Sequence, residues 1–594
     1  MTDVLSSEET RSEVGAVFAD WFDRFAAALT AQDLDALDDL VAPDGWWRDL
    51  LALTWDLTTV QGRSDIRGLL AARLPATPLS DFAIVAEMPP AASDVGDWIQ
   101  AFFDFRTPIA TGRGVVRLRR SDTDGVWRAW TIATTMSDLD GHERPIGDAR
   151  SMGPQHLPGR SARENWLDRR LRKAAFAETE PQVVVIGGGQ GGLSVAANLG
   201  LMGVDTLVIE RNERIGDSWR KRYHSLVLHD PVWADHLPYL QFPPSWPVYT
   251  PKDKIADWFE SYASAMELNV WTGTEMVSSS YDEQARTWTI VVRGPYGDRT
   301  LHPRHVVMAT GASGEPNVPD IPGRDDFAGT VYHSSAHQGA QGWAGKRAVV
   351  IGACNSGHDI AQDLCESGAQ VMMVQRSSTY IMSRQYGIPT IFGALYHENG
   401  LPTDYADLLN AAFPWPVVLE FAKAQTKQIA ALDADLLRRL EAAGFKLNDG
   451  LDGGGLMSYA LRNGGGYYID VGCSDLIADG KVGVRQGVGV ASFTPDGVQL
   501  EDGSVLDADL VVFATGYSNM RDTARRLFGD SVAGATKPVL GLAEDNELNT
   551  IWRRSGHPGF WYMGGPLAWA RIYSRYLALQ IVGELAGLRA DSTD

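Results

Sequence analysis

Cysteine is scarce in this sequence, which has three in 594 residues: Cys354, Cys365 and Cys473. No two of them have the Cys-x-x-Cys spacing of a thiol redox pair or of a common zinc site. A disulfide framework and a cysteine-bound metal are therefore not expected, and no other pattern in the sequence predicts a metal site. This cysteine usage favours a reducing, cytoplasmic environment.

Long apolar runs and positive net charge are also absent. No stretch of about 18 apolar residues occurs, so we expect no membrane-spanning helix. The first ten residues, MTDVLSSEET, are acidic and lack an apolar core, so we expect no signal peptide. The net charge of −22 disfavours nucleic acid and anionic membranes as partners.

The length is too great for one hydrophobic core, so we expect roughly three or more domains. The order of helical and strand patterns predicts an α/β protein, with two Rossmann-like dinucleotide-binding domains after an α+β domain. The expected boundaries are 1–140 for the α+β domain, 141–180 for a linker, 181–346 and 481–594 for the first dinucleotide domain, and 347–480 for the second, with a helical insertion.

The N-terminal region changes from helical to strand-like patterns. Apolar residues recur with a helical period in 12–40, and residues 81–135 contain strand-like segments. This order resembles the SnoaL-like domains, in which a curved sheet surrounds a pocket. Asp49 and Asp56 lie among tryptophans, and if their segment is helical they share one face. They are candidates for acid–base chemistry, with pocket lining or dimer packing as alternatives, so a homodimer is an option.

A β-strand, a glycine-rich loop, a helix and a second strand follow one another in residues 183–209. The loop has the GxGxxG spacing, which allows a tight turn, close approach of a diphosphate, and close packing of helix on strand. Its glycines are Gly187, Gly189 and Gly192. Glu210 ends the second strand, where a carboxylate can accept hydrogen bonds from the ribose hydroxyls of an adenosine.

The same unit recurs at residues 347–375, and Gln375 occupies the position equivalent to Glu210. Arg376 and Ser377 follow it, and a guanidinium with hydroxyls suits a 2′-phosphate that a carboxylate would repel. The first unit is therefore predicted to bind FAD and the second NADPH. Cys354 replaces the middle glycine of the second loop, where a thiol crowds the diphosphate. The other loop residues predicted to contact NADPH are Gly352, Asn355, Ser356 and Gly357.

Two segments are suited to cover a flat cofactor ring. Residues 215–258 are rich in aromatics and prolines, and Trp219 in this cover is expected to contact the cofactor. The helical insertion, residues 389–468, supplies core packing or lines a substrate channel. Near the C-terminus, a strand at 560–563 leads through two glycines into a helix whose N-terminus can face the flavin.

The ordered motifs in residues 181–588 resemble those of the flavin-containing monooxygenases, the class B flavoprotein monooxygenases. The FxGxxxH core of the family fingerprint is at Phe327–His333, although His337 replaces its last aromatic residue. The family's FATGY is at residues 513–517 and includes Thr515 and Gly516; its NSG is at 355–357. The RYPG of Baeyer–Villiger enzymes is absent, because residues 222–225 read RYHS.

The resemblance also assigns two histidines to catalysis. His229 stands where the plant YUCCA-type enzymes have a histidine, so it is expected near the flavin, favouring the oxygenated intermediate. His333 is expected to couple hydride transfer to cofactor rearrangement. The alternative for each is a structural histidine.

The resemblance implies that NADPH reduces FAD and that O₂ then adds at C4a to give a hydroperoxyflavin. This species would oxygenate a small organic substrate by N- or S-oxygenation, or by oxidative decarboxylation of an arylpyruvate. A Baeyer–Villiger ketone oxygenase, and an NADPH oxidase or flavin reductase that oxygenates no substrate, are the alternatives.

Overall fold

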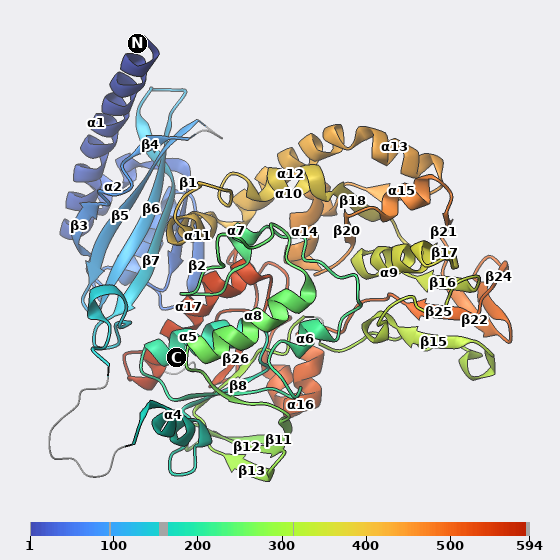
Figure 1. Cartoon of the computed structure of the whole chain (residues 1–594). Coiled ribbons are helices and arrows are strands. Elements are labelled where there is room, and N and C mark those ends of the chain that lie inside the picture. Colours follow the sequence, from blue (N-terminus) through green and yellow to red (C-terminus); the bar gives the residue numbers. More distant parts are fainter. Residues whose placement is uncertain (1, 94–96, 154–163, 313, 590–594) are drawn as a thin grey trace.

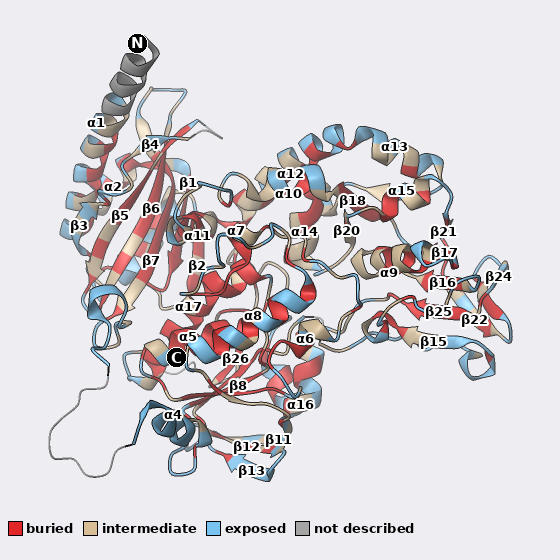
Figure 2. Cartoon of the chain, in the orientation of Figure 1, coloured by how far each residue is buried: buried red, intermediate tan, exposed pale blue. Residues whose placement is uncertain are grey.

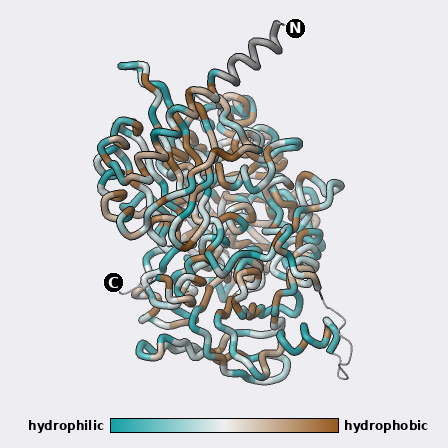
Figure 3. The backbone as a smooth tube through the Cα atoms, turned by 90° about the vertical axis from the view of Figure 1, so that its left-hand side faces the viewer, coloured by the Kyte–Doolittle hydropathy of each residue, from teal (hydrophilic) through white to brown (hydrophobic). Residues whose placement is uncertain are grey.

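The computed structural model describes residues 2–93, 97–153, 164–312 and 314–589, of which residues 2–12 are described by their backbone alone (Figure 1). It has an N-terminal α+β part, two parallel five-stranded sheets and a helical insertion. None of the described helices is long and apolar enough to cross a membrane. Hydrophobic and hydrophilic stretches alternate along the described backbone (Figure 3).

The N-terminal part is one curved sheet in the order β2-β1-β7-β6-β5-β3, with β4 beside β5. Its helices cover one face, where Phe18, Trp21 and Phe25 of the first helix pack against Trp47 and Phe103 of the sheet. These aromatic side chains fill the space between the first helix and the sheet. The expected α+β architecture is present, while the SnoaL-like identity stays a prediction. The elements are α1 (Thr2–Ala31), α2 (Leu34–Leu40), β1 (Val41–Leu50), β2 (Leu57–Gln61), α3 (Arg63–Arg73), β3 (Ser80–Ile84), β4 (Ala91–Ala92), β5 (Trp98–Thr107), β6 (Ala110–Arg120) and β7 (Trp127–Leu139).

The helical alternative for residues 49–56 is wrong, because Asp49 lies in β1 and Asp56 directly before β2. Asp49 is fully buried and accepts hydrogen bonds from Thr134 Oγ1 and Thr54 Oγ1, both at 2.7 Å. Burial raises the pKa of Asp49 to about 6, against the effect of these hydrogen bonds. Asp56 pairs with Arg553 at 3.2 Å. Both carboxylates are held by fixed partners, which favours a structural role over acid–base chemistry.

The opposite face of the N-terminal sheet packs on the helical insertion. Trp98 and Trp130 contact Phe413 and Phe421 across this boundary, and the Arg117 guanidinium lies 3.5 Å from the ring centre of Phe413. Since side chains alternate between the faces of a strand, Trp47 faces inward while its neighbours Trp46 and Arg48 face the insertion. A homodimer stays a prediction, and it would have to use a different surface.

A buried ion pair joins the N-terminal part to the rest of the molecule. Arg48 donates from Nε and Nη2 to the two carboxylate oxygens of Glu547, at 2.8 Å each, and both side chains are at most 1% exposed. Glu547 also accepts from Thr59 Oγ1 at 2.6 Å and from Trp415 Nε1 at 3.1 Å. Because the pair is buried, removing either Arg48 or Glu547 alone would leave an uncompensated charge and cost about 3–5 kcal/mol.

The first parallel sheet has the order β10-β9-β8-β14-β26. Its three central strands, β8, β9 and β14, are buried on both faces, as expected for parallel strands under helices (Figure 2). The predicted strand, loop, helix and strand of the first unit are confirmed, and the helix begins at Gln190. The elements are α4 (Trp166–Ala175), β8 (Val183–Ile186), α5 (Gln190–Leu201), β9 (Thr206–Ile209), α6 (Asp217–Arg220), α7 (Val232–Asp235), α8 (Lys252–Ala265), β10 (Asn269–Trp271), β11 (Glu275–Asp282), β12 (Thr287–Gly294), β13 (Gly297–Leu301), β14 (His305–Met308), α16 (Met520–Ala535), β26 (Phe560–Tyr562) and α17 (Leu567–Leu585).

The second parallel sheet has the order β15-β25-β16-β17-β21, which corrects the expected boundaries. The expected boundaries place residues 330–333 and 482–513 in the first dinucleotide domain, whereas β15, β21 and β25 pair in the second parallel sheet. Among the described strands of the C-terminal part, only β26 at 560–562 pairs in the first parallel sheet. The elements are β15 (Thr330–His333), β16 (Arg347–Ile351), α9 (Asn355–Glu366), β17 (Gln370–Gln375), α15 (Cys473–Ala478), β21 (Val482–Gln486), β22 (Val490–Thr494), β23 (Gly497–Leu500), β24 (Val505–Asp507) and β25 (Leu510–Phe513).

The insertion is helical, as predicted, and lies between the N-terminal part and the second sheet (Figure 1). A small three-stranded sheet, β19-β18-β20, connects it to the second unit. The elements are β18 (Thr379–Ser383), α10 (Arg384–Phe392), α11 (Thr403–Ala412), α12 (Trp415–Leu432), α13 (Ala434–Ala442), β19 (Leu447–Asn448), α14 (Gly455–Arg462) and β20 (Tyr467–Asp470).

Candidate active site

The glycine loop of the first unit is shaped by two close backbone contacts. Gly187 has φ +113°, and a Cβ there would lie 2.5 Å from the carbonyl oxygen of Ala309. A Cβ on Gly192 would lie 1.9 Å from the carbonyl oxygen of Gly187. Gly189, directly before α5, faces open space instead. The loop thus leaves room for a diphosphate at Gly189, at the N-terminus of a helix.

The start of α17 lies beside this loop. A Cβ added to Gly191 would lie 3.5 Å from the Cα of Gly564, and Gln190 Nε2 donates to the carbonyl oxygen of Gly565 at 3.3 Å. The beginning of α5 and the turn before α17 are therefore adjacent. Two helix N-termini at one edge of the sheet suit an anionic, elongated ligand.

Glu210 lies at the carboxyl end of β9, as predicted, and is 7% exposed. Its Oε2 accepts a hydrogen bond from the Gly188 N–H at 2.8 Å, and its Oε1 accepts from the backbone and side-chain nitrogens of Asn212 at 2.7 Å. The carboxylate therefore fixes the glycine loop as well as marking the expected ribose position.

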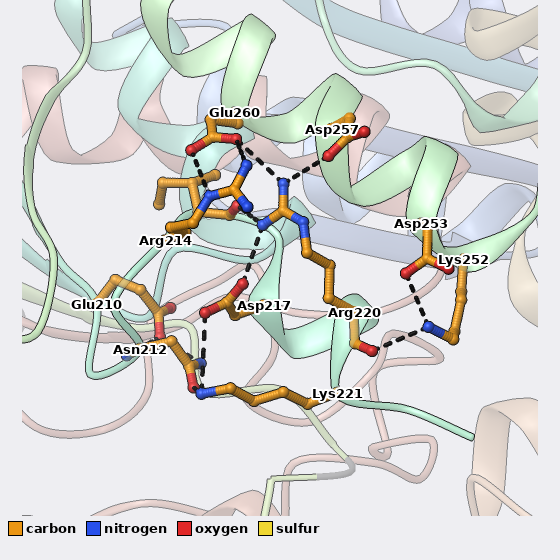
Figure 4. Close-up of polar contacts among 11 residues, drawn as sticks. Glu210, Asn212, Arg214, Asp217, Arg220, Lys221, Lys252, Asp253, Asp257 and Glu260 are labelled. Carbon is orange, nitrogen blue, oxygen red and sulfur yellow. Dashed lines mark hydrogen bonds and ion pairs between the residues drawn. The ribbon is translucent and has the colours of Figure 1, made fainter. Parts of the chain in front are cut away.

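A chain of hydrogen bonds and ion pairs extends from Glu210 through Asn212 to α8 (Figure 4). Lys221 donates to Asn212 Oδ1 at 2.7 Å and lies 3.8 Å from Asp217. Asp217 pairs with Arg220 at 3.0 Å, which in turn pairs with acids of α8. Trp219 is in the same short helix, half-buried in a cluster that includes residues of α5. These contacts anchor α6, at the beginning of the cover, beside Glu210 and the first glycine loop.

The second glycine loop repeats the geometry of the first. Gly352 has φ +115°, with a Cβ position 2.3 Å from the carbonyl oxygen of Ala514, and a Cβ on Gly357 would lie 2.2 Å from Gly352 O. Cys354 stands directly before α9, and burial raises the pKa of its thiol. Asn355 Oδ1 accepts from the Ile469 N–H at 3.0 Å, and Ser356 is half-buried.

Two cationic residues meet at the end of β17: Arg376, which follows the strand, and Lys446, whose backbone is hydrogen-bonded to Gln375. Gln375 is buried and holds the backbone of Lys446, donating to its carbonyl oxygen at 2.9 Å and accepting from its N–H at 2.8 Å. Arg376, Ser377 and Lys446 are exposed. Within the described part of the chain, neither Arg376 nor the Lys446 ammonium has a hydrogen-bond or ion-pair partner. Lys446 lies far along the sequence, so only the Gln375 contact identifies it.

His333 ends β15 and is buried, with both ring nitrogens engaged. Nδ1 accepts from the Ser335 N–H at 3.1 Å, so Nε2 carries the proton and donates to the Gly516 carbonyl oxygen at 2.9 Å. Burial lowers the pKa of His333 and keeps the ring neutral. Thr515 Oγ1 donates to the Asn317 carbonyl oxygen at 2.5 Å. His333 therefore fixes the Thr515–Gly516 turn. This turn also holds Asn317, in the segment that leads from the first parallel sheet to the second.

His229 has a different environment, in the cover before α7. Its side chain is 38% exposed, and Nε2 lies 3.9 Å from Asp230 Oδ1. Tyr223 of the same cover donates a hydrogen bond to Asp359 of α9. Burial raises the pKa of Asp359 to about 6, while the Tyr223 hydrogen bond and the charge of His229 lower it. His229 thus lies in the cover, whereas His333 lies at the end of β15.

No described group of three or more metal-ligating side chains could hold a metal ion.

Comparison with known proteins agrees with this arrangement. The family described as pyridine nucleotide-disulphide oxidoreductase matches residues 184–388. The indole-3-pyruvate monooxygenase YUCCA1 of Oryza sativa subsp. japonica is 32% identical over 365 residues, which cover 61% of this chain and 79% of that protein. The probable indole-3-pyruvate monooxygenase YUCCA7 of Arabidopsis thaliana is 32% identical over 343 residues, covering 56% and 73%.

A solved structure shows the same fold at lower identity. A cyclohexanone monooxygenase bound to epsilon-caprolactone superposes with a TM-score of 0.51 at 18% identity, covering 68% of this chain and 88% of that one. The family itself is established by the two relatives above. The chain belongs to the flavin-containing monooxygenases, a family of enzymes that depend on a flavin and NADPH.

Proposed function

We propose that the protein is an FAD- and NADPH-dependent monooxygenase that uses O₂ to oxygenate a small organic substrate. The observation that carries the proposal is a pair of glycine loops with the same geometry. The second strand of one unit is followed by an acidic residue, and that of the other by basic residues. Glu210 follows the first loop, whereas Arg376 and Lys446 lie beside the end of the second unit's strand. A carboxylate suits a ribose diol, and two cations suit a 2′-phosphate.

The residues divide between the two cofactors accordingly. Glu210 and the first glycine loop would hold FAD, with Trp219 in the cover near it. NADPH would be held by the second loop, by residues 355–357, and by Arg376, Ser377 and Lys446. A bound, reduced flavin supplies the electrons that activate O₂. Cover and insertion then serve to exclude water, which would otherwise favour release of peroxide.

The histidines have separate proposed roles. His229, half-exposed in the cover, would hold or move a proton close to the flavin. His333 would position the Gly516 turn between the two units through its Nε2 hydrogen bond. His229→Ala should lower the fraction of NADPH oxidation that yields product, and His333→Ala should slow flavin reduction. Full coupling and unchanged reduction in both variants would contradict these roles.

The reaction type has two main candidates. Relatives about 30% identical are named indole-3-pyruvate monooxygenases, which supports oxidative decarboxylation of an arylpyruvate. N- or S-oxygenation is the other. A Baeyer–Villiger reaction has support only from the fold shared with the cyclohexanone monooxygenase.

Rapid mixing distinguishes a monooxygenase from an oxidase or reductase. NADPH-reduced enzyme is mixed with oxygenated buffer, and the flavin absorbance is followed. A monooxygenase should regain the oxidised spectrum slowly, and more slowly with NADP⁺ present, because the shielded site retains activated oxygen. Immediate reoxidation with stoichiometric peroxide, whichever amine, sulfide, ketone or arylpyruvate is added, would favour an NADPH oxidase or flavin reductase.

A further inference from the structure

Trp552, in the segment between α16 and β26, has a backbone conformation that is unusual for a large residue. Its φ is +65°, in the left-handed region that favours glycine, and the residue is only 1% exposed. Its N–H donates to the Tyr562 carbonyl oxygen at 3.1 Å, and its carbonyl oxygen accepts from Gln580 Nε2 at 3.0 Å. A strained conformation persists only where the surrounding structure fixes it, and such residues cluster at functional sites.

The Trp552 side chain supports the turn between β26 and α17. Its indole Nε1 donates to the Gly564 carbonyl oxygen at 2.9 Å. Gly565 has φ +106°, and a Cβ there would lie 3.1 Å from the Trp552 ring. This turn adjoins the first glycine loop at Gly191 and precedes the helix whose N-terminus is expected to face the flavin. The position of Trp552 therefore fixes the position of that N-terminus.

The N-terminal part holds the segment of Trp552 on both sides. Before Trp552, Glu547 is held by Arg48 in the buried ion pair. Directly after Trp552, Arg553 donates from Nε and Nη2 to the two carboxylate oxygens of Asp56, at 3.2 Å each. Both contacts come from β1 and the turn that follows it, so one edge of the N-terminal sheet determines where this segment lies.

The same edge of the N-terminal sheet packs on α17. Trp55 lies in the turn between β1 and β2, and a Cβ on Gly583 of α17 would lie 2.5 Å from its ring. Tyr573 of α17 accepts a hydrogen bond from Arg48 Nη2 at 3.4 Å. Its ring stacks on that of Trp552, with centres 4.1 Å and planes 5° apart. The N-terminal part thus reaches Trp552 through α17 as well as along the chain.

We propose that the N-terminal part is a structural component of the flavin site, because it holds the residue that positions the turn before α17. Arg48 and Asp56 hold the segment of Trp552, and Trp552 is the positioning residue for Gly564 and Gly565. The inference rests on the proposed function, since it requires FAD at the first glycine loop. When FAD is bound, the positive end of α17 favours negative charge on the reduced ring, so a displaced turn makes the flavin harder to reduce.

Trp552→Phe removes the indole N–H and keeps a ring to stack on Tyr573. In the purified flavoenzyme, we expect the midpoint potential of the flavin to become more negative and its visible absorbance bands to move. The Kd for FAD should rise about threefold to tenfold. Trp561→Phe is the matched control, because it removes the indole N–H of another buried tryptophan, which donates to His305 Nδ1 at 3.2 Å. It should lower the unfolding temperature without changing the potential or the absorbance.

Asp56→Asn tests the contribution of the N-terminal part. Arg553 keeps the carboxylate of Asp545, 2.7 Å away, so this variant should fold. We expect a smaller shift of the potential in the same direction. In the double variant with Trp552→Phe no further shift should occur, because Asp56 acts through Trp552. Asp124→Asn, which breaks an ion pair inside the N-terminal part, is the control and should leave the potential unchanged.

Three outcomes would contradict the inference. If Trp552→Phe lowers the unfolding temperature as Trp561→Phe does but keeps the wild-type potential and absorbance, Trp552 serves stability alone. If Asp56→Asn and Asp124→Asn have equal potentials, the N-terminal part does not act on the turn. A wild type that binds no FAD would overturn the proposed function, and the inference with it. No substrate or O₂ is present in these measurements, so they are independent of what the enzyme oxygenates.

Discussion

The two glycine loops of this chain follow one steric plan and lead to different chemistry. In both, a Cβ on the last glycine would lie about 2 Å from the carbonyl oxygen of the first, at 1.9 Å in one and 2.2 Å in the other. After the second strand, Glu210 points back to the first loop, whereas Gln375 points to the Lys446 backbone and leaves Arg376 exposed. The shared turn suits a dinucleotide, and we propose that the few residues after the strand determine which dinucleotide binds.

The largest effect should come from Gly192, the last glycine of the first loop, where the geometry of the two loops is the same. Gly192→Ala places a methyl group against Gly187 O, which no side-chain movement can relieve, and should cost about 3 kcal/mol or more. We expect loss of bound FAD and a lower unfolding temperature, measured by the FAD-to-protein ratio and by calorimetry. Gly200→Ala, in the same helix with no atom within 4 Å of its Cβ position, should instead stabilise by about 0.5–1 kcal/mol. Full FAD occupancy in Gly192→Ala would show that the loop is not the diphosphate site.

Arg376→Ala tests the chemical difference between the units. Loss of a charged hydrogen bond should weaken NADPH by about 1.5–3 kcal/mol, seen as a higher KM for NADPH with NADH nearly unaffected. Arg438→Ala, which removes an exposed arginine of α13, should change neither. Equal effects of Arg376→Ala on NADPH and NADH would remove the assignment of the second site to a 2′-phosphate.

A smaller effect of the same kind is expected at Lys446. Its ammonium is a flexible point charge rather than a rigid fork, so Lys446→Met should weaken NADPH by about 1 kcal/mol and leave NADH unchanged. With Arg376→Ala, the double variant should deviate from additivity, since both cations would contact one phosphate. Strict additivity would indicate that Lys446 lies too far from the 2′-phosphate to contribute.

The smallest effect should come from Cys354, the one side chain in the second loop where the first has the open Gly189. Cys354 has φ −107°, which does not require glycine, so Cys354→Gly changes mainly the space for the diphosphate. We expect NADPH binding to improve by less than about 1 kcal/mol, measured as Kd on the oxidised enzyme. Weaker binding in this variant would mean that the thiol supports the loop rather than crowding it.

The sequence predicted those features that depend on neighbours along the chain. The strand, loop and helix around Gly187 and around Gly352 form where the local pattern placed them, because turn sterics and burial act within about 30 residues. The membership of β15, β21 and β25 in the second sheet was not predicted, because it depends on pairing between segments far apart. Lys446 was missed for a related reason, because only a tertiary hydrogen bond with Gln375 identifies it.

The Arg48–Glu547 ion pair has a consequence for the order in which the molecule forms. Its two residues are 499 positions apart, so the ribosome releases Arg48 long before Glu547 exists. Because domains begin to fold during synthesis from the N-terminal end, the N-terminal sheet can form while the Arg48 guanidinium is still hydrated. Its water is replaced by Glu547 only when the last strand and α17 arrive. Burial of this arginine is therefore a late event, and a nascent chain halted before residue 547 should hold the N-terminal sheet folded but undocked.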